Sequence, residues 1–479
     1  MAYADFRDFL SALNKQNDLL EVDRYVDIQV DLGKALQKSA AINGPALVFK
    51  NNGTDYPLVG GIYNSRAKAL LAFQATEETI FETIMKGLNK PIPPVIVKYG
   101  ANCENVLRGT QIDLSKLPIP KYSPLDGGPY ITAGLIVSQD PETKITDLGN
   151  YRFEYINTTS LSFLAQPSHR LGKHIAKAKK MGLTKYHAAI VIGVDPILEY
   201  TCQFQSSDNT NDYDIAGGLR GAAVELIKCQ MIDLMVPAAA EFVLELEIDL
   251  TQQVFEGPLG EYTGYYTPGS PKPVAKVVAI THRNNAYFQA LLTGVPPTEN
   301  HILKQIPFEA SVLNNLQQQF PTIKQVAIPA SGGVSFYMVI AMEPRFSGEA
   351  RQAILAAIAS NVRPKMVVVV NTDIDVQNPD QVQWAMSFRM QPQTDVIIIG
   401  DVPAGPLDPS VPDDLPLDQR LGSALGIDAT YPFGSIVDEI PPSERNSVDK
   451  TLYFKVAEIP GWQEYNFPEL AQFKNRQSH

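Results

Sequence analysis

Two glutamates on either side of a tight turn are the residues best suited to chemistry. The segment FEGPLGEYTGYY places Glu256 and Glu261 around Gly-Pro-Leu-Gly, so their carboxylates can converge on one cavity. A general acid at neutral pH needs a carboxyl group whose pKa is raised by burial, while a second acid held by a cation stays ionised. The spacing alone is also that of a hairpin with solvated acids, so it marks a candidate site and not yet a function.

Three further segments carry residues that suit a metal or an anion. The segments are TDLGNYRFEY with Asp147 and Arg152, QPSHRLGKHI with His169, and NTNDYDIAGGLRG with Asp212. Arg152 can form a two-pronged contact with a substrate carboxylate or with Glu256. Oxygen, nitrogen and oxygen ligands from the other three residues suit Mn²⁺ or Mg²⁺ better than zinc. Taken singly, each residue is also typical of an ordinary surface or turn, and AGGLRG lacks the spacing of known phosphate-binding loops.

The elements that would position these residues change in character along the chain. Residues 1–117 alternate helical periodicity, including one stretch at 67–88, with short strands, and predict an α/β domain. Residues 118–310 carry short apolar runs broken by turn residues, which indicate a β-barrel or sandwich. These runs are 131–138, 188–194, 243–250, 274–281 and 286–292. Residues 311–479 alternate strands with helices, which predicts a sheet covered by helices on its faces.

Composition excludes several classes of partner. The chain has 479 residues, 44% of them hydrophobic, and a formal charge of −12, so it offers no broad basic face for nucleic acid or an anionic membrane. Its longest apolar runs are far shorter than the roughly 18 residues of a membrane span. The start MAYADFRDFLSAL is typical of a domain helix and not of a signal peptide, and Cys103, Cys202 and Cys229 are scattered without metal-type spacing. We expect a cytoplasmic protein with structural cysteines.

With these residues in order, the chain resembles the UbiD family of decarboxylases. The resemblance runs from YADFRDFLSAL to LGIDAT and is most specific at FEGPLGEYTGYY. It implies an N-terminal α/β domain, a central split β-barrel that binds prenylated FMN, and a C-terminal α/β oligomerisation domain. It also implies that Arg152, Glu256 and Glu261 form a catalytic trio. In it Glu261 carries the proton, Glu256 orients Arg152, and Arg152 meets the substrate carboxylate and the flavin.

The resemblance further implies sites for metal, cofactor and substrate. The family binds a divalent metal through Asn, His and Glu, and the matching residues here are Asp147, His169 and Asp212, two of which depart from the pattern. Asn150 is an alternative ligand if the strand contains a bulge. A nearby K⁺ is also implied. The remaining implied cofactor contacts are Tyr151, Ser168 and Arg351, and the implied substrate-pocket residues are His301 and Lys304.

The function that the resemblance implies is reversible, non-oxidative decarboxylation of an aromatic, heteroaromatic or α,β-unsaturated acid, with release of CO₂. A flavin prenyltransferase would supply the cofactor, and the assembly would be a homodimer or a homohexamer. Two alternatives stay open: a non-catalytic, accessory flavin-binding protein, and an FMN reductase on a similar barrel. The sequence leaves undecided the acid, the direction of the reaction, the assembly, and the choice of Mn²⁺ or Mg²⁺.

Overall fold

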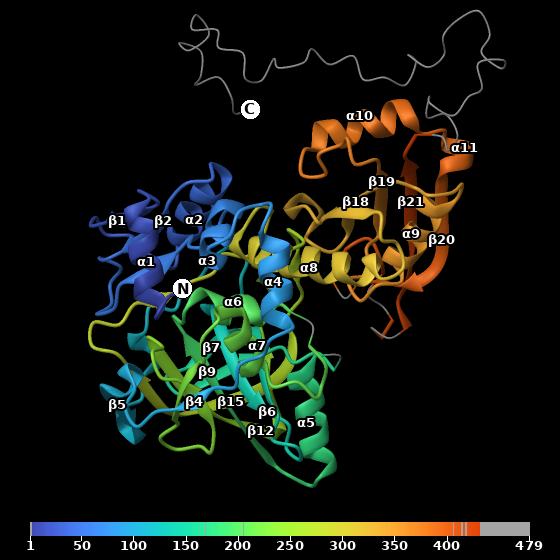
Figure 1. Cartoon of the computed structure of the whole chain (residues 1–479). Helices are drawn as coiled ribbons and strands as arrows, with labels where there is room; N and C mark the ends of the chain where they lie inside the picture. Colours follow the sequence, from blue (N-terminus) through green and yellow to red (C-terminus); the bar gives the residue numbers. More distant parts are fainter. Residues whose placement is uncertain are drawn as a thin grey trace, which may run out of the picture.

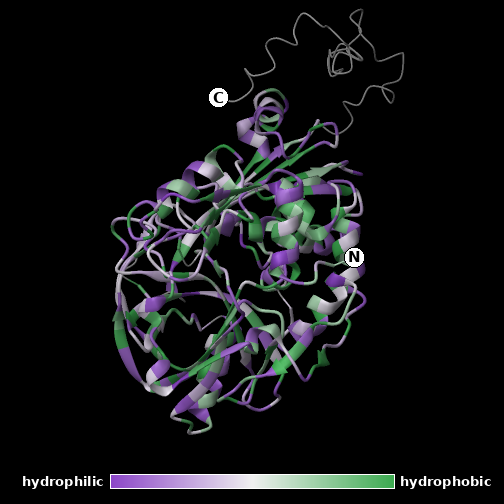
Figure 2. Cartoon of the chain, turned by 90° about the vertical axis from the view of Figure 1, so that its left-hand side faces the viewer, coloured by the Kyte–Doolittle hydropathy of each residue, from purple (hydrophilic) through white to green (hydrophobic). Residues whose placement is uncertain are grey.

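The structure arranges the chain in three parts. The computed structural model describes residues 2–167, 169–204, 206–405, 407–412, 415–416 and 419–431. Figure 1 shows an N-terminal part in blue, a barrel mainly in green, and a C-terminal sheet with helices in orange, with α8 (Glu299–Gln317) leading toward the C-terminal sheet. Figure 2 shows hydrophobic and hydrophilic residues mixed along all three parts. No helix in the described ranges is long and apolar enough to cross a bilayer.

The N-terminal part is a four-stranded sheet with helices, and one of its strands comes from far along the chain. The strand order is β1 (Leu19–Val22), β2 (Ala46–Phe49), β3 (Leu58–Gly60) and β16 (Phe288–Gln289). The helices are α1 (Phe6–Lys15), α2 (Leu32–Ala41), α3 (Arg66–Phe73) and α4 (Ile80–Leu88). Phe6, Phe9, Leu10 and Leu13 of α1 are buried at helical spacing, which confirms the opening helix.

Two predicted segments lie in this part. The stretch 67–88, where helical periodicity was expected, forms two helices, and α3 ends where Gln74 adopts a left-handed conformation with φ 51°. The run 286–292 was expected among the barrel strands, but its short strand β16 pairs with β3 in the N-terminal sheet. The chain therefore leaves the barrel after β15 and returns to the N-terminal part.

Six antiparallel strands form a closed barrel in the middle of the molecule, which confirms the predicted barrel. In order they are β12 (Phe242–Glu256), β9 (Lys185–Ile192), β6 (Tyr130–Gln139), β7 (Thr146–Asn157), β8 (Ser160–Phe163) and β15 (Ser270–His282). Pairing of β12 with β15, with Leu244 opposite Ile280, closes the ring. Side chains such as Phe153, Phe163 and Leu246 fill an apolar core.

Smaller elements surround the barrel. They are β4 (Val95–Ile96), β5 (Asn105–Arg108), β10 (Glu225–Lys228), β11 (Met235–Pro237), β13 (Leu259–Gly260), β14 (Tyr266–Thr267), α5 (Arg170–Lys180), α6 (Pro196–Thr201) and α7 (Asp212–Arg220). Single turns of 3₁₀ helix lie at Ala101–Cys103, Gly109–Gln111, Leu114–Lys116 and Ala330–Gly332. Because β5 pairs with β15, the chain joins the barrel sheet by residue 105. The predicted domain limits at 117 and 310 stay predictions.

The C-terminal part is a five-stranded mixed sheet with helices on both faces. Its order is β17 (Ile323–Ala327), β18 (Tyr337–Met342), β19 (Met366–Val370), β21 (Leu421–Ala429) and β20 (Val396–Pro403). The helices are α9 (Glu349–Ile358), α10 (Pro379–Arg389) and α11 (Pro392–Asp395). Val367 and Val369 pack in one cluster with α9, while Val368 and Val370 pack in another with α10. The unbroken run of valines in β19 was therefore a correct signal of a strand buried on both faces.

Candidate active site

A partly buried arginine contacts both glutamates of the FEGPLGE segment. Arg152 lies on β7, and its Nε and Nη2 donate to Glu256 Oε1 at 3.4 and 3.2 Å. Its Nη1 forms an ion pair with Glu261 Oε1. Glu256 and Glu261 expose 1% and 7% of their surface. Burial raises the pKa of Glu256, and the Arg152 guanidinium opposes that shift. Lys272 also lowers the pKa of Glu256, so two cations act on this carboxylate while burial acts against them.

Glycines hold the turn between the two glutamates in place. A Cβ atom added to Gly257 would lie 2.4 Å from Gly127 Cα, so the two backbones meet where no side chain fits. The Gly257 amide donates to Glu154 Oε2 at 2.7 Å, and the Gly260 amide donates to Asp126 Oδ1 at 3.0 Å. The turn is thus fixed at both ends by side chains from outside it.

Tyr262 connects the glutamate turn to the two predicted substrate-pocket residues. His301 Nδ1 accepts from the Thr298 amide at 3.1 Å, so its Nε2 carries the proton and donates to the Tyr262 carbonyl at 2.6 Å. Burial lowers the pKa of His301 to about 4, which keeps the imidazole neutral. The Lys304 ammonium lies 4.3 Å from the centre of the Tyr262 ring.

Lys304 has no carboxylate partner among the described residues. Burial lowers the pKa of its ammonium to about 8. A cation that is removed from water without a counter-ion favours binding of an anion beside it. Lys304, beside the ring of Tyr262, is therefore a second candidate group for binding an anion.

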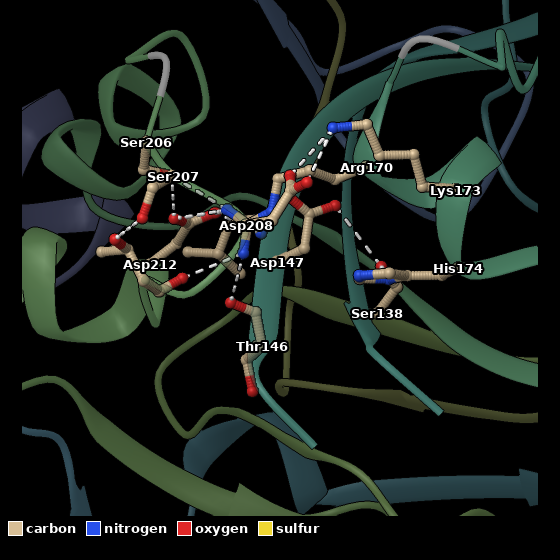
Figure 3. Close-up of polar contacts among 12 residues, drawn as sticks. Ser138, Thr146, Asp147, Arg170, Lys173, His174, Ser206, Ser207, Asp208 and Asp212 are labelled. Atoms are coloured by element: carbon tan, nitrogen blue, oxygen red, sulfur yellow. Dashed lines mark hydrogen bonds and ion pairs between the residues drawn. The ribbon is translucent and has the colours of Figure 1, made fainter. Parts of the chain in front are cut away.

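A second cluster joins Asp147 and Asp212 through an arginine that sequence reasoning missed. Arg170, the first residue of α5, donates through Nη1 to both carboxylate oxygens of Asp212 at 2.9 Å. Its Nε lies 3.2 Å from Asp147 Oδ1. Figure 3 shows the guanidinium between the two carboxylates. Burial raises the pKa of Asp147 to about 7, with Arg170 lowering it and Asp212 raising it further.

Comparison with known proteins identifies the family. Models of the 3-octaprenyl-4-hydroxybenzoate carboxy-lyase N-terminal, Rift-related and C-terminal domains match residues 10–88, 95–296 and 301–429. The solved UbiD-class enzyme HmfF from Pelotomaculum thermopropionicum, in complex with FMN, is 31% identical with a TM-score of 0.87. That match covers 96% of this chain and 99% of the other. The chain belongs to the UbiD family.

Other relatives agree with the UbiD assignment. An evolved dimeric form of HmfF in complex with prFMN is 30% identical with a TM-score of 0.84, over 97% of this chain and 99% of that one. The vanillic acid decarboxylase of Sedimentibacter hydroxybenzoicus, in its open form, is 27% identical with a TM-score of 0.83 over 97% and 98%. An uncharacterized protein of Archaeoglobus fulgidus is 29% identical over 452 residues, 90% of this chain and 92% of its own. This UbiD-family protein is a carboxy-lyase.

The metal ligands that the UbiD resemblance implies are not gathered around one point. His169 caps α5 at the surface, with its ring 6.1 Å from that of Tyr151, and no described contact joins it to Asp147 or Asp212. No group of three His, Cys, Asp or Glu side chains in the described ranges is placed to hold a metal ion. With Arg170 between the two aspartates, the present arrangement does not fit a divalent metal. The predicted metal set stays a prediction.

The other predicted cofactor contacts have different surroundings. Asn150 Nδ2 donates to Glu199 Oε2 at 3.4 Å, and burial raises the pKa of Glu199 to about 8. Arg351 is an exposed residue of α9 and donates to the Thr394 carbonyl oxygen, and no described contact joins it to the barrel residues. Ser168 lies outside the described residues.

Sequence reasoning missed Arg170, Tyr262 and Glu199, which all contact predicted site residues. For Arg170 a signal was present, because it follows His169 directly and the two nearby aspartates require a cation. For Glu199 there was none, since its partner lies 49 positions away on another element.

Proposed function

We propose that this UbiD-family chain reversibly decarboxylates an aromatic, heteroaromatic or α,β-unsaturated carboxylic acid with prenylated FMN as cofactor. The observation that carries the proposal is the contact of partly buried Arg152 with both Glu256 and Glu261. The solved relatives that bind FMN or prFMN support the cofactor, and the relative that acts on vanillic acid supports an aromatic substrate.

The chain's own residues divide the work of the reaction. Arg152 binds the substrate carboxylate and orients it, and Glu256 holds the guanidinium in place. The bond between the substrate carbon and its carboxylate breaks, CO₂ leaves, and a new C–H bond forms with a proton from the Glu261 carboxyl group. Glu261 then regains a proton from water. Carboxylation runs the same steps in reverse.

Prenylated FMN, when bound, supplies the electrophilic centre that accepts the electron pair released by the breaking bond. An anionic flavin suits this site because Arg152, which exposes only 11% of its side chain, supplies a cation beside it. Asn150, Tyr151, Ser168, His169 and Arg351 remain the proposed further contacts. The divalent metal predicted at Asp147, His169 and Asp212, with a K⁺ beside it, is not part of this proposal, because Arg170 lies between the two aspartates.

Lys304 and His301 suggest the class of substrate. Lys304 can pair with a second acidic group of a substrate, and hydrogen bonds from Thr298 through His301 to the Tyr262 carbonyl hold Tyr262 next to the ammonium. We therefore propose an acid with a ring heteroatom or a second carboxylate. A flavin prenyltransferase as cofactor supplier, a homodimeric or homohexameric assembly, and a cytoplasmic location complete the proposal.

The test is anaerobic co-expression with a flavin prenyltransferase, followed by mass and absorbance analysis of the bound flavin. CO₂ release is then screened over aromatic and heteroaromatic acids, with Glu261→Gln as the matched variant. We expect bound prenylated FMN, and turnover that falls at least about 10²-fold in the variant while the flavin is retained.

Other outcomes point to the two alternatives. Prenylated FMN without turnover on any acid would indicate an accessory flavin-binding protein. Plain FMN with oxidation of a nicotinamide cofactor would indicate a reductase, and either result contradicts the proposed function.

A further inference from the structure

The Arg170 guanidinium is held by hydrogen bonds from its two terminal nitrogens and by an ion pair at Nε, which itself makes no hydrogen bond among the described residues. Nη1 donates to Asp212 and to Ser206 Oγ, the latter at 2.9 Å. Nη2 donates to the backbone carbonyls of Thr210 at 2.9 Å and Thr146 at 3.4 Å. Nε faces Asp147. Contacts with five residues fix the position of the guanidinium, so Arg170 is a structural part of this cluster.

The carboxylates of Asp147 and Asp212 also accept hydrogen bonds from groups other than Arg170. Asp212 Oδ1 accepts from Ser206 Oγ at 2.7 Å, and Oδ2 accepts from the Leu148 amide at 2.9 Å, each in addition to Arg170. Asp147 Oδ2 accepts from Ser138 Oγ at 3.4 Å. A divalent ion would have to displace the guanidinium and several of these donors before it gained a carboxylate oxygen.

The local backbone decides which side chain faces the aspartates. His169 caps α5 in extended conformation, with ψ 152°, and Arg170 is the first helical residue, so the two neighbours point in different directions. A cation at the first turn of a helix is disfavoured by the helix dipole, unless carboxylates balance it. Asp147 and Asp212 provide that balance, and Asp212 is itself stabilised as the first residue of α7.

We propose that Arg170 takes the place of a divalent metal ion as the cation that Asp147 and Asp212 hold. Flavin binding by this chain then needs no divalent metal. This inference rests on the proposed function only for its flavin part, since the statement about metal can be tested on the protein alone.

The first experiment uses the full chain without flavin. Mn²⁺ is titrated into the protein and free Mn²⁺ is followed by electron paramagnetic resonance. We expect no stoichiometric binding to the wild type. Retention of one Mn²⁺ per chain after gel filtration would overturn the inference, whether or not the protein binds flavin.

The second experiment uses the flavin-loaded protein. Dialysis against EDTA should leave the flavin-to-protein ratio unchanged. Metal analysis should find no divalent ion in a fixed molar ratio to the bound flavin. Loss of flavin that added Mn²⁺ restores would overturn the inference. A chain that never loads flavin would contradict the proposed function alone, because the Mn²⁺ titration would still stand.

Matched variants separate the role of Arg170 from a general charge effect. Arg170→Lys keeps the charge but cannot contact both aspartates through a planar fork, and we expect flavin affinity to fall at least about tenfold, which Mn²⁺ does not restore. Lys173→Gln removes a cation one turn along α5 whose ion pair among the described residues is with exposed Asp208, and it should leave affinity unchanged. Since a misfolded Arg170→Lys would be uninformative, the wild-type titration remains the deciding measurement.

Discussion

Single buried titratable groups set the expected pH behaviour of this protein. Lys304, with a pKa near 8, is protonated below that pH and loses its charge as the pH rises through it. If Lys304 binds an acidic group of the substrate, KM should rise between about pH 7 and 9. Steady-state kinetics across that range measures the effect.

Two variants make the Lys304 prediction specific. Lys304→Arg stays charged at all these pH values and should show a flat KM profile, whereas Lys304→Met should show a high KM throughout. An unchanged rise of KM in Lys304→Arg would mean that another group titrates.

Glu199 offers a stability test at the same scale. Burial raises its pKa to about 8, so the folded state holds a proton that the unfolded state releases near pH 4.5. The contribution of the protonated Glu199 carboxyl to the free energy of unfolding is therefore fully present below about pH 4.5. This contribution is lost as the pH rises toward 8. Glu199→Gln mimics the protonated acid, so its melting temperature relative to wild type should increase from pH 6 to pH 9. Equal differences at both pH values would contradict the assignment of a neutral Glu199.

At the scale of elements, the contact between two backbones fixes the catalytic turn. Gly257→Ala would place Cβ 2.4 Å from Gly127 Cα, which forces the turn carrying both glutamates to move. We expect about 1–3 kcal/mol of lost stability, as in other overpacked sites, together with a larger loss of turnover. Thermal unfolding and CO₂ release measure the two effects.

Gly260→Ala is the matched control in the same turn. Its added Cβ would meet nothing closer than Ser123 Oγ at 3.7 Å, which is an ordinary contact. It should leave both measurements near those of the wild type, and equal damage in the two variants would count against the backbone contact.

The sequence was informative wherever a local pattern carried the signal. The FEGPLGE segment predicted a pair of acids that converge, and Arg152 does contact both. The valines of β19 predicted a strand buried on two faces. Local pattern failed where a tertiary contact decides the outcome. Arg170 and His169 are neighbours in the sequence, and the position of α5 relative to Asp212 determines which of them faces the aspartates.

At the scale of the whole molecule, one buried glutamate links the N-terminal part to the C-terminal part. Glu309 on α8 accepts from Arg66 of α3 at 2.7 Å, from the Ile328 amide at 3.0 Å and from Gln377 at 3.3 Å. Removing its charge would leave Arg66 with a weaker partner in a buried setting. Glu309→Gln should therefore lower stability by about 2–4 kcal/mol in thermal unfolding.

Glu77→Gln is the control for that measurement. Glu77 pairs with the same arginine, but about half of its side chain is exposed, so its loss should cost at most about 1 kcal/mol. Similar losses of stability in Glu309→Gln and Glu77→Gln would contradict a larger contribution from the contacts of Glu309 on α8.

The strand β16 also bears on how the protein is made. Phe288 and Gln289 complete the N-terminal sheet beside β3, yet the ribosome synthesises them only after the whole barrel. At about 5–20 residues per second, the edge of β3 stays uncovered for many seconds after it emerges. A nascent chain therefore has to keep its first domain incomplete until the barrel is finished, and expression of residues 1–117 alone would yield an open sheet edge that is prone to aggregation.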